Sequence, residues 1–310
     1  MLTHAKGNFG RKRSTPYIAQ LANWGAPLRE ERVRQVEVFK TKSADGVSLM
    51  GVVSGNPNGA PILFIHGFSQ CHLAWRRQMT DPELTAHFRL VAYDMRGHGG
   101  SDKPIEGERY REDRLWAEDL AAVIATVGLK RPVVVAWSYG GRVVSDYLRF
   151  YSQDSLGGVN YVSAVTKSDS AFWGAEHRHI TAMASDDLMT NIRASRKLVQ
   201  ASFAQPPATD DFDMTLAYTM LVPAKVRAGL LDRTRNDGDI LGSLRLGVLV
   251  THGALDRLVL PAAGHYTAAN VPGARLSLYG GIGHCPFFED APRFNRELFD
   301  FVSVQQHLPF

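Results

Sequence analysis

Short apolar runs alternate along the chain with longer segments whose apolar positions repeat every three or four residues. The short runs are rich in valine, leucine and isoleucine, as is typical of strands buried on both faces of a sheet. We expect strands at residues 36–40, 47–53, 61–65, 90–93, 133–137, 159–165, 248–252 and 275–279. Helical spacing is clearest at residues 110–128 and 288–304 and directly after residue 138. The alternation predicts an α/β fold: a mostly parallel, twisted sheet covered by helices on both faces.

The alternation stops between Thr166 and Gly242. This stretch carries apolar and aromatic residues in several short helix-like pieces and no convincing strand. We interpret residues 167–242 as a helical cap inserted into a core that is formed by residues 35–166 and 243–310. The cap is expected to cover the edge of the sheet at which the parallel strands end.

The positive charge of the chain is concentrated in a basic N-terminal arm, residues 1–34. The arm holds seven Lys or Arg and two acidic residues, which is +5, so the rest of the +4 chain is near −1. We therefore expect no nucleic-acid binding, and Arg11-Lys12-Arg13 is interpreted as part of a solvated arm or packed helix. No apolar run approaches 18 residues, and two cysteines form no disulfide scaffold. No membrane insertion and a reduced, cytoplasmic setting are expected.

Ser138 occupies a distinctive position between a strand and a helix. The strand expected at 133–137 stops at this serine, and the small residues Gly140 and Gly141 lead directly into the helical run. A strand, a serine, a tight turn and a helix form a nucleophile elbow, which exposes the serine hydroxyl above the edge of the sheet. Small residues are needed because the strand and helix backbones pass close together there. Ala136 stands where a glycine is usual in this pattern.

Two later residues provide the partners that a serine nucleophile needs. A serine hydroxyl is a weak nucleophile without an adjacent base. His284 follows the last expected strand in a glycine-rich loop, and Asp256 follows the strand expected at 248–252. A carboxylate fixes the tautomer of the histidine and stabilises its protonated form. The chain order Ser138, Asp256, His284 is the order that this kind of sheet uses for a catalytic triad.

Five motifs in this order make the chain resemble the α/β-hydrolase family over about residues 35 to 305, and most closely its branch of small esterases and cofactor-free haloperoxidase-like enzymes. They are Phe64-Ile65-His66-Gly67-Phe68, Asp94-Met95-Arg96-Gly97-His98-Gly99-Gly100-Ser101, Ala136-Trp137-Ser138-Tyr139-Gly140-Gly141, Gly253-Ala254-Leu255-Asp256 and Gly283-His284. The resemblance implies that the backbone N–H groups of Phe68 and Tyr139 form the oxyanion hole. It also implies Asp169 as an alternative acid, and structural roles for His66, Asp94 and His98.

These residues favour a carboxylic-ester hydrolase that works through an acyl-enzyme. Serine at residue 138 argues against haloalkane dehalogenase and epoxide hydrolase chemistry, since members of the family with those activities carry aspartate there. The alternatives are a lactonase, a hydrolase of carbon–carbon bonds next to a ketone, and a ligand receptor on the same fold. Perhydrolase activity in the related branch goes with a proline after the oxyanion aromatic residue, where this chain has Ser69.

The expected substrate is a small ester with a hydrophobic acyl or aryl group. Candidate pocket residues, most of which also suit the core of the cap, are Trp137, Trp173, Met183 and Tyr218. No phosphate-binding loop or dinucleotide fingerprint is present, and the pair His177 and His179 lacks the helical spacing of metal ligands. We expect neither a metal nor a cofactor. Cys71 and Cys285 are interpreted as structural, buried cysteines, and the sequence leaves the oligomeric state open.

Overall fold

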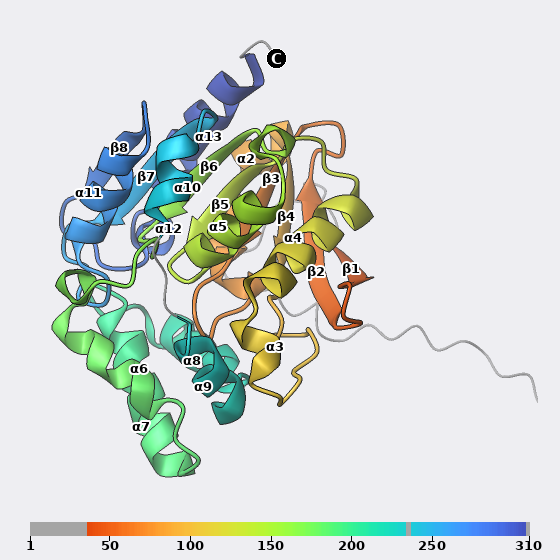
Figure 1. Cartoon of the computed structure of the whole chain (residues 1–310). Coiled ribbons are helices and arrows are strands. Elements are labelled where there is room, and N and C mark those ends of the chain that lie inside the picture. Colours follow the sequence, from red (N-terminus) through yellow and green to blue (C-terminus); the bar gives the residue numbers. More distant parts are fainter. Residues whose placement is uncertain (1–35, 234–236, 308–310) are drawn as a thin grey trace, which may run out of the picture. The chain divides into compact units, whose positions relative to one another are not determined.

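The protein contains an eight-stranded sheet that is antiparallel at one edge and parallel elsewhere (Figure 1). The computed structural model describes residues 36–233 and 237–307, so the predicted basic arm lies outside the described residues. The strand order is β1-β2-β4-β3-β5-β6-β7-β8, in which β1–β2 and β2–β4 pair antiparallel and all later pairs are parallel. The strands are β1 (Glu37–Lys42), β2 (Ser48–Gly55), β3 (Ala60–Ile65), β4 (Phe88–Tyr93), β5 (Val133–Trp137), β6 (Gly158–Val162), β7 (Gly247–Gly253) and β8 (Arg275–Tyr279). The predicted α/β fold and its eight strands are confirmed.

Helices cover both faces of the sheet, as the apolar strands require. One face packs against α4 (Asp113–Val127), α5 (Gly140–Phe150), α10 (Gly238–Ser243) and α11 (Pro261–Asn270). The other face packs against α1 (Arg76–Met79), α2 (Pro82–His87), α12 (Pro286–Glu289) and α13 (Ala291–His307). β5, at the centre of the order, is buried along its whole length.

Three predicted elements differ from the structure: one strand ends early, and two helices are divided. The strand expected at 159–165 ends at Val162, because Ser163 adopts a positive φ of 42° and turns the chain away from the sheet. The helix expected at 110–128 is divided at Glu112, whose backbone is extended, into α3 (Glu108–Arg111) and α4; Gly128 ends α4 in the left-handed conformation, as predicted. The helix expected at 288–304 is divided at Asp290 into α12 and α13.

Between β6 and β7 the described residues form helices and no named strand. They are η4 (Ser170–Phe172), η5 (Ala175–Arg178), α6 (His179–Ala182), α7 (Leu188–Ala201), α8 (Thr209–Met220), α9 (Ala224–Leu231) and α10. In Figure 1, α6 to α9 lie beyond the edge at which β3, β5, β6 and β7 end, whereas α10 lies against the face of the sheet. Of the segment that we interpret as the cap, α6–α9 lie beyond this edge, whereas α10 packs on the core helices α5 and α11.

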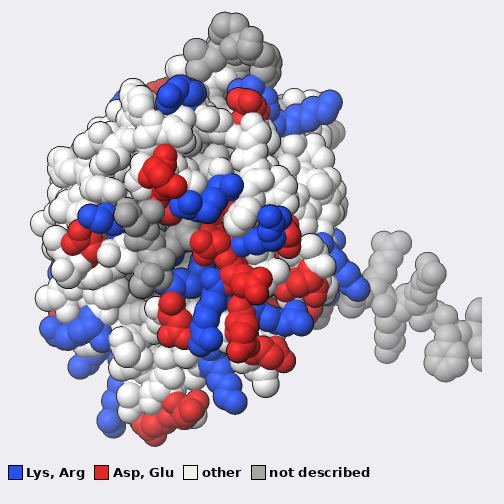
Figure 2. Space-filling model, viewed as in Figure 1, with Lys and Arg blue, Asp and Glu red and all other residues white. Residues whose placement is uncertain are grey.

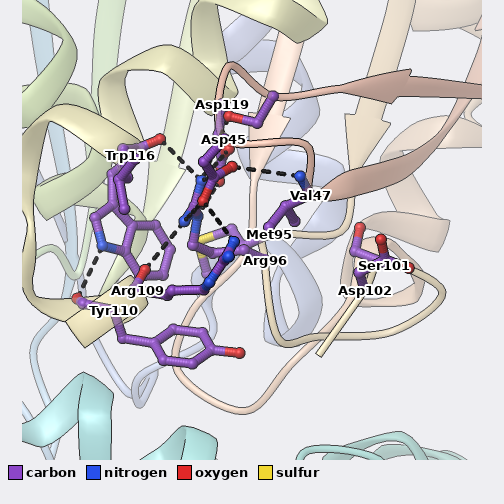
Figure 3. Close-up of polar contacts among 12 residues, drawn as sticks. Asp45, Val47, Met95, Arg96, Ser101, Asp102, Arg109, Tyr110, Trp116 and Asp119 are labelled. Atoms are coloured by element: carbon purple, nitrogen blue, oxygen red, sulfur yellow. Dashed lines mark hydrogen bonds and ion pairs between the residues drawn. The ribbon is translucent and has the colours of Figure 1, made fainter. Parts of the chain in front are cut away.

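A buried arginine anchors the turn that follows β4 (Figure 3). Arg96 is fully buried and donates two hydrogen bonds of 2.7 Å to the Asp119 carboxylate on α4. It also donates to Asp45 in the turn between β1 and β2, at 3.0 Å, and to the Arg109 carbonyl. Burial alone would lower the pKa of the Arg96 guanidinium, but the two carboxylates outweigh burial and raise it. The arginine thus stays charged and ties the turn after β4 to these three segments.

Acidic and basic side chains are intermixed on the face seen in Figure 2, so no single-sign patch covers it. Exposed ion pairs such as Arg111 with Asp232 at 2.6 Å contribute to this mixture. Among the described residues, no helix is both long and apolar enough to cross a bilayer.

Candidate active site

Ser138 lies at the end of β5 in a strained turn. It adopts a φ of 52°, a conformation that is uncommon for residues other than glycine and that clusters at functional sites. Its backbone N–H donates to the Val162 carbonyl at 2.9 Å, and its own carbonyl accepts from Gly141 and from Val165. These bonds hold the turn in place. The side chain is only partly buried and lines a cavity at the edge of the sheet.

Close backbone contacts explain the small residues around the elbow. A Cβ atom at Gly140 would lie 2.9 Å from the Ile65 carbonyl oxygen, and one at Gly141 would lie 2.8 Å from the Cβ of Ala164. A Cβ atom at Gly67 would lie 3.2 Å from the Cβ of Ser138 itself. A side chain at any of these positions would push the elbow away from its neighbours.

His284 and Asp256 form a buried hydrogen-bonded pair. Nδ1 of His284 lies 2.6 Å from Oδ2 of Asp256, and each residue is less than 5% exposed. Oδ1 of Asp256 accepts the backbone N–H groups of Leu258 and Val259, at 2.9 and 3.0 Å. The carboxylate is therefore fixed by its own loop and oriented toward the imidazole. His284 also lines the cavity, together with Ser138.

A second histidine contacts the same carboxylate. Nε2 of the fully buried His252 lies 3.3 Å from Oδ2 of Asp256 and 2.8 Å from the Val259 carbonyl oxygen. Because that carbonyl only accepts, Nε2 carries the proton. Burial alone would raise the pKa of the Asp256 carboxyl, but the charges and hydrogen bonds of His284 and His252 lower it well below its usual value. Asp256 is therefore ionised at neutral pH, as the partner of an imidazolium must be.

Asp169, the alternative acid, does not reach the histidine, and this prediction is wrong. Its Oδ1 accepts the backbone N–H of Ala171 at the start of η4, and its Oδ2 pairs with Lys167 at 2.9 Å. The side chain is one third exposed. The Asp169 carboxylate is thus engaged by the start of η4 and by Lys167, whereas Asp256 makes the pair with His284.

The backbone of His284 is held from three sides. Its N–H donates to the Ser202 carbonyl at 2.9 Å, and its carbonyl accepts from the indole Nε1 of Trp137 at 2.9 Å. Glu289 on α12 accepts the N–H of Gly283, at 2.9 Å, and the N–H of Ala204, just beyond α7, at 2.7 Å. The glycine-rich loop that carries the histidine is thus joined to the elbow strand and to the end of a cap helix.

Phe68 and Tyr139 bring two backbone N–H groups to the cavity. Tyr139 directly follows Ser138, and Phe68 follows the end of β3; both line the cavity, and their rings lie 6.4 Å apart. Within the described residues, neither backbone N–H donates a hydrogen bond. Two free donors beside a strained serine are what an oxyanion hole requires.

His66 and His98 hold the Phe68 loop from behind. Nδ1 of His66 donates to the Gly67 carbonyl at 2.8 Å, and its Nε2 accepts the Met95 N–H at 3.0 Å. Nε2 of His98 accepts the Ser69 N–H at 3.2 Å, and its Nδ1 donates to the Arg96 carbonyl. These bonds require both rings to be neutral. Burial lowers the pKa of His66 to about 4 and that of His98 to about 3.

The protein is expected to lose stability as the pH falls from 6.5 toward 4. In this window the unfolded chain binds protons at residues 66 and 98, whereas the folded chain does not, so the free energy of unfolding rises with pH. Between pH 6.5 and 5 the loss is at most about 2 kcal/mol for each histidine. Urea unfolding at several pH values measures it. His98→Gln should flatten this dependence, whereas the exposed His87→Gln should not; an unchanged slope in His98→Gln would contradict the assignment.

The cavity has a volume of about 250 Å³, and its wall is part apolar and part polar. Of the predicted pocket residues, Trp137 and Trp173 line it. Met183 does not: it is fully buried between the cap and the core, where it packs with Leu198 of α7 and with Leu258 in the loop after β7. Tyr218 lines a separate cavity of about 20 Å³. The predictions that Met183 and Tyr218 line the active-site cavity are therefore wrong. Both side chains are buried in the interior and do not face this cavity.

The sequence did not identify several polar residues of the wall. Arg142, on the first turn of α5, and His177, in η5, line the cavity together with Ser168 and Arg233. Among these residues, only Arg142 had a sequence signal for a place in the cavity wall, because it follows Ser138 by four residues. His177, Ser168 and Arg233 lie in the segment between β6 and β7, whose path the sequence does not define.

The thiols of Cys71 and Cys285 are buried and free. Burial raises the pKa of both thiols well above the usual value, so neither is a thiolate at neutral pH. Cys71, His72 and Asp94 lie close enough together to hold an ion. However, the Asp94 carboxylate already accepts hydrogen bonds from the backbone and ring of His72 and from the Gly100 N–H. This arrangement organises the turn after β4.

The comparisons with known proteins agree with this fold. A family model of the α/β-hydrolase fold matches residues 60–203. The structure superposes on that of a candidate aryl esterase from Burkholderia cenocepacia with a TM-score of 0.84 and 35% sequence identity, covering 88% of this chain and 100% of the other. The chain therefore belongs to the α/β-hydrolase family.

Two sequence relatives refine the class. A bifunctional esterase/perhydrolase from Acinetobacter calcoaceticus is 28% identical over 83% of this chain and 97% of its own length. A non-heme chloroperoxidase from Kitasatospora aureofaciens is 27% identical over 79% of this chain and 93% of its own length. The predicted resemblance to small esterases and haloperoxidase-like proteins is confirmed, and the protein is an enzyme of the α/β-hydrolase class.

Proposed function

We propose that the protein hydrolyses carboxylic esters with Ser138 as the nucleophile, His284 as the general base and acid, and Asp256 as the residue that orients His284. The observation that carries the proposal is the buried pair of His284 and Asp256, 2.6 Å apart, on the same cavity as a serine with a strained backbone. The esterase relatives support ester hydrolysis as the reaction.

The reaction follows from the chemistry of these groups. Ser138 Oγ attacks the ester carbonyl while Nε2 of His284 takes its proton. The Phe68 and Tyr139 N–H groups stabilise the oxyanion, and the protonated His284 then gives its proton to the departing alcohol, which leaves an acyl-enzyme. Water, deprotonated by His284, attacks the acyl-enzyme and releases the acid. Asp256, ionised throughout, stabilises the imidazolium in both steps.

The cavity favours a small ester with an apolar acyl or aryl group. Ten of its lining side chains are apolar: Phe68, Trp137, Val165, Trp173, Ile180, Leu198, Leu230, Leu231, Leu258 and Val259. Burial of apolar substrate surface against such a wall supplies binding free energy of about 25 cal/mol per Å². No partner other than such a small molecule is proposed.

Perhydrolysis is disfavoured by the backbone next to Phe68. Ser69 adopts a φ of 58°, and a proline cannot adopt a positive φ. A proline, which goes with perhydrolase activity in the related branch, therefore does not fit the backbone at residue 69.

A substrate panel tests the proposal. We expect 4-nitrophenyl butyrate to be turned over faster than about 1 s⁻¹, the ordinary range of enzymes. The panel also includes a γ-lactone and a vinylogous 1,5-diketone acid. Turnover of only the lactone or the diketone would replace the ester assignment with a lactonase or a carbon–carbon bond hydrolase, and stoichiometric release of nitrophenol without further turnover would favour a receptor.

A further inference from the structure

Arg142 contributes a buried positive charge to the wall of the active-site cavity. It is 8% exposed and lies on α5, four residues after Ser138. Its Nη1 donates to the Arg233 carbonyl at 2.6 Å, and its Nη2 lies 3.4 Å from the Ser168 hydroxyl. Its guanidinium carbon lies 5.1 Å from the centre of the Tyr139 ring. These contacts fix the guanidinium beside the residue that supplies a proposed oxyanion donor.

The charged side chains in the wall of the cavity are both positive. Among the described residues that line it are Arg142 and Arg233, and no aspartate or glutamate. The charge of Arg233 faces Asp113 and Asp146, at 2.8 and 2.7 Å, and neither of these acids lines the cavity. In a partly desolvated cavity such a wall attracts an anion much more strongly than it would in water.

His177 lies near Arg142 and completes the polar part of the wall. Its ring stacks on Trp173 with 4.2 Å between ring centres. Burial, together with the charge of Arg142, lowers the pKa of His177 to about 4. At neutral pH the ring is therefore uncharged and offers one N–H donor, so Arg142 is the permanent cation of this part of the wall.

We propose that Arg142, Ser168 and His177 form an anion subsite that binds a carboxylate of the substrate. The preferred substrates are then small esters with an apolar body that ends in a carboxylate. The planar fork of an arginine matches the two oxygens of a carboxylate, and a hydroxyl and a neutral imidazole add neutral donors. This inference rests on the proposed ester hydrolysis and adds the class of substrate to it.

The test compares charged and neutral esters of the same shape. One pair is 4-nitrophenyl hydrogen adipate and the 4-nitrophenyl ester of adipic acid monoamide, in which the carboxylate lies on the acyl side. The other is 4-butyryloxybenzoate and 4-butyryloxybenzamide, in which it lies on the leaving group. We expect kcat/KM for the charged member of at least one pair to exceed that of its neutral partner by about 10- to 100-fold, the effect of a hydrogen bond to a charged group.

Two variants assign this preference to the subsite. Arg142→Gln should lower kcat/KM about 10- to 100-fold for the charged ester and less than about threefold for the neutral one. The matched control is Arg149→Gln on the same helix, where the side chain pairs with Asp239 at 3.1 Å outside the cavity; it should change neither. An equal loss for both esters in Arg142→Gln would show a purely structural role and overturn the proposal.

An inhibition measurement covers the case in which Arg142→Gln does not fold. Benzoate should inhibit the unaltered enzyme at a concentration about tenfold lower than benzamide does. Equal inhibition, together with equal turnover of charged and neutral esters, would overturn the anion subsite and leave the esterase intact. If the panel esters and 4-nitrophenyl butyrate all remain uncleaved, the proposed function itself fails.

Discussion

Replacing Ser138 with alanine is expected to lower kcat for 4-nitrophenyl butyrate by about 10⁵-fold. The variant keeps the cavity, the proposed oxyanion donors and the pair of His284 and Asp256, but no atom is left to form the acyl-enzyme. The residual rate should reflect binding and oxyanion stabilisation alone. Steady-state kinetics measure the loss, and mass spectrometry of the unaltered enzyme after a fluorophosphonate should find the label on Ser138.

Ser163→Ala is the matched control for this variant. Ser163 also has a positive φ, 42°, and follows the end of the neighbouring strand β6, but it does not line the cavity. Its activity should stay within about threefold of the unaltered protein, since Ser163 is buried away from the cavity and the substitution removes only its hydroxyl group. If Ser138→Ala kept a tenth or more of the activity while Ser163→Ala lost it, Ser138 would not be the nucleophile.

Replacing Asp256 with asparagine is expected to lower kcat by about 10⁴-fold, with a much smaller change in KM. Oδ2 of Asp256 accepts the proton of His284 Nδ1, and an amide at this place either turns its NH₂ group toward the ring or offers a neutral oxygen. With its NH₂ group toward the ring, the amide holds the imidazole in the wrong tautomer. With its oxygen toward the ring, it provides no negative charge to stabilise the imidazolium. Kinetics at pH 7.5, with circular dichroism to verify folding, measure this effect.

Asp169→Asn is the control that discriminates between the two candidate acids. Asp169 is partly exposed and pairs with Lys167, so its loss should change kcat by less than about threefold. A large loss in Asp169→Asn with little effect in Asp256→Asn would reverse the assignment and would require the loop after β6 to move toward His284.

The strand pattern predicted the sheet well because each buried strand carries its own signal. A run such as Val133-Val134-Val135 is apolar on both faces, and only a central parallel strand accommodates this. Element ends were less predictable. Glu112 interrupts a helix whose periodicity continues through it: its backbone is extended between α3 and α4, and its residue type does not signal a break.

The cap was the least predictable part of the site. Aromatic and methionine residues in short helices have two possible uses, a cavity wall or the core of the cap, and periodicity does not distinguish them. Met183 is fully buried between the cap and the core, while Trp173 lines the cavity. The polar residues of the cavity wall were not predicted for a related reason. Arg142 and His177 lie more than 30 residues apart in the sequence, and only the folded chain brings them to the same cavity.

By itself, the sequence determined which residues stand at the ends of the strands: a serine after β5, an aspartate after β7 and a histidine after β8. The carboxyl ends of parallel strands meet at one edge, so the order of these residues along the chain was enough to predict the candidate triad. Only the tertiary structure decided which acid contacts the histidine, because it places the Asp169 carboxylate on Lys167 and Ala171 and the Asp256 carboxylate on His284. The tertiary structure alone also decided which charged side chains line the cavity. The path of the cap depends on packing between distant side chains, and no local sequence pattern defines it.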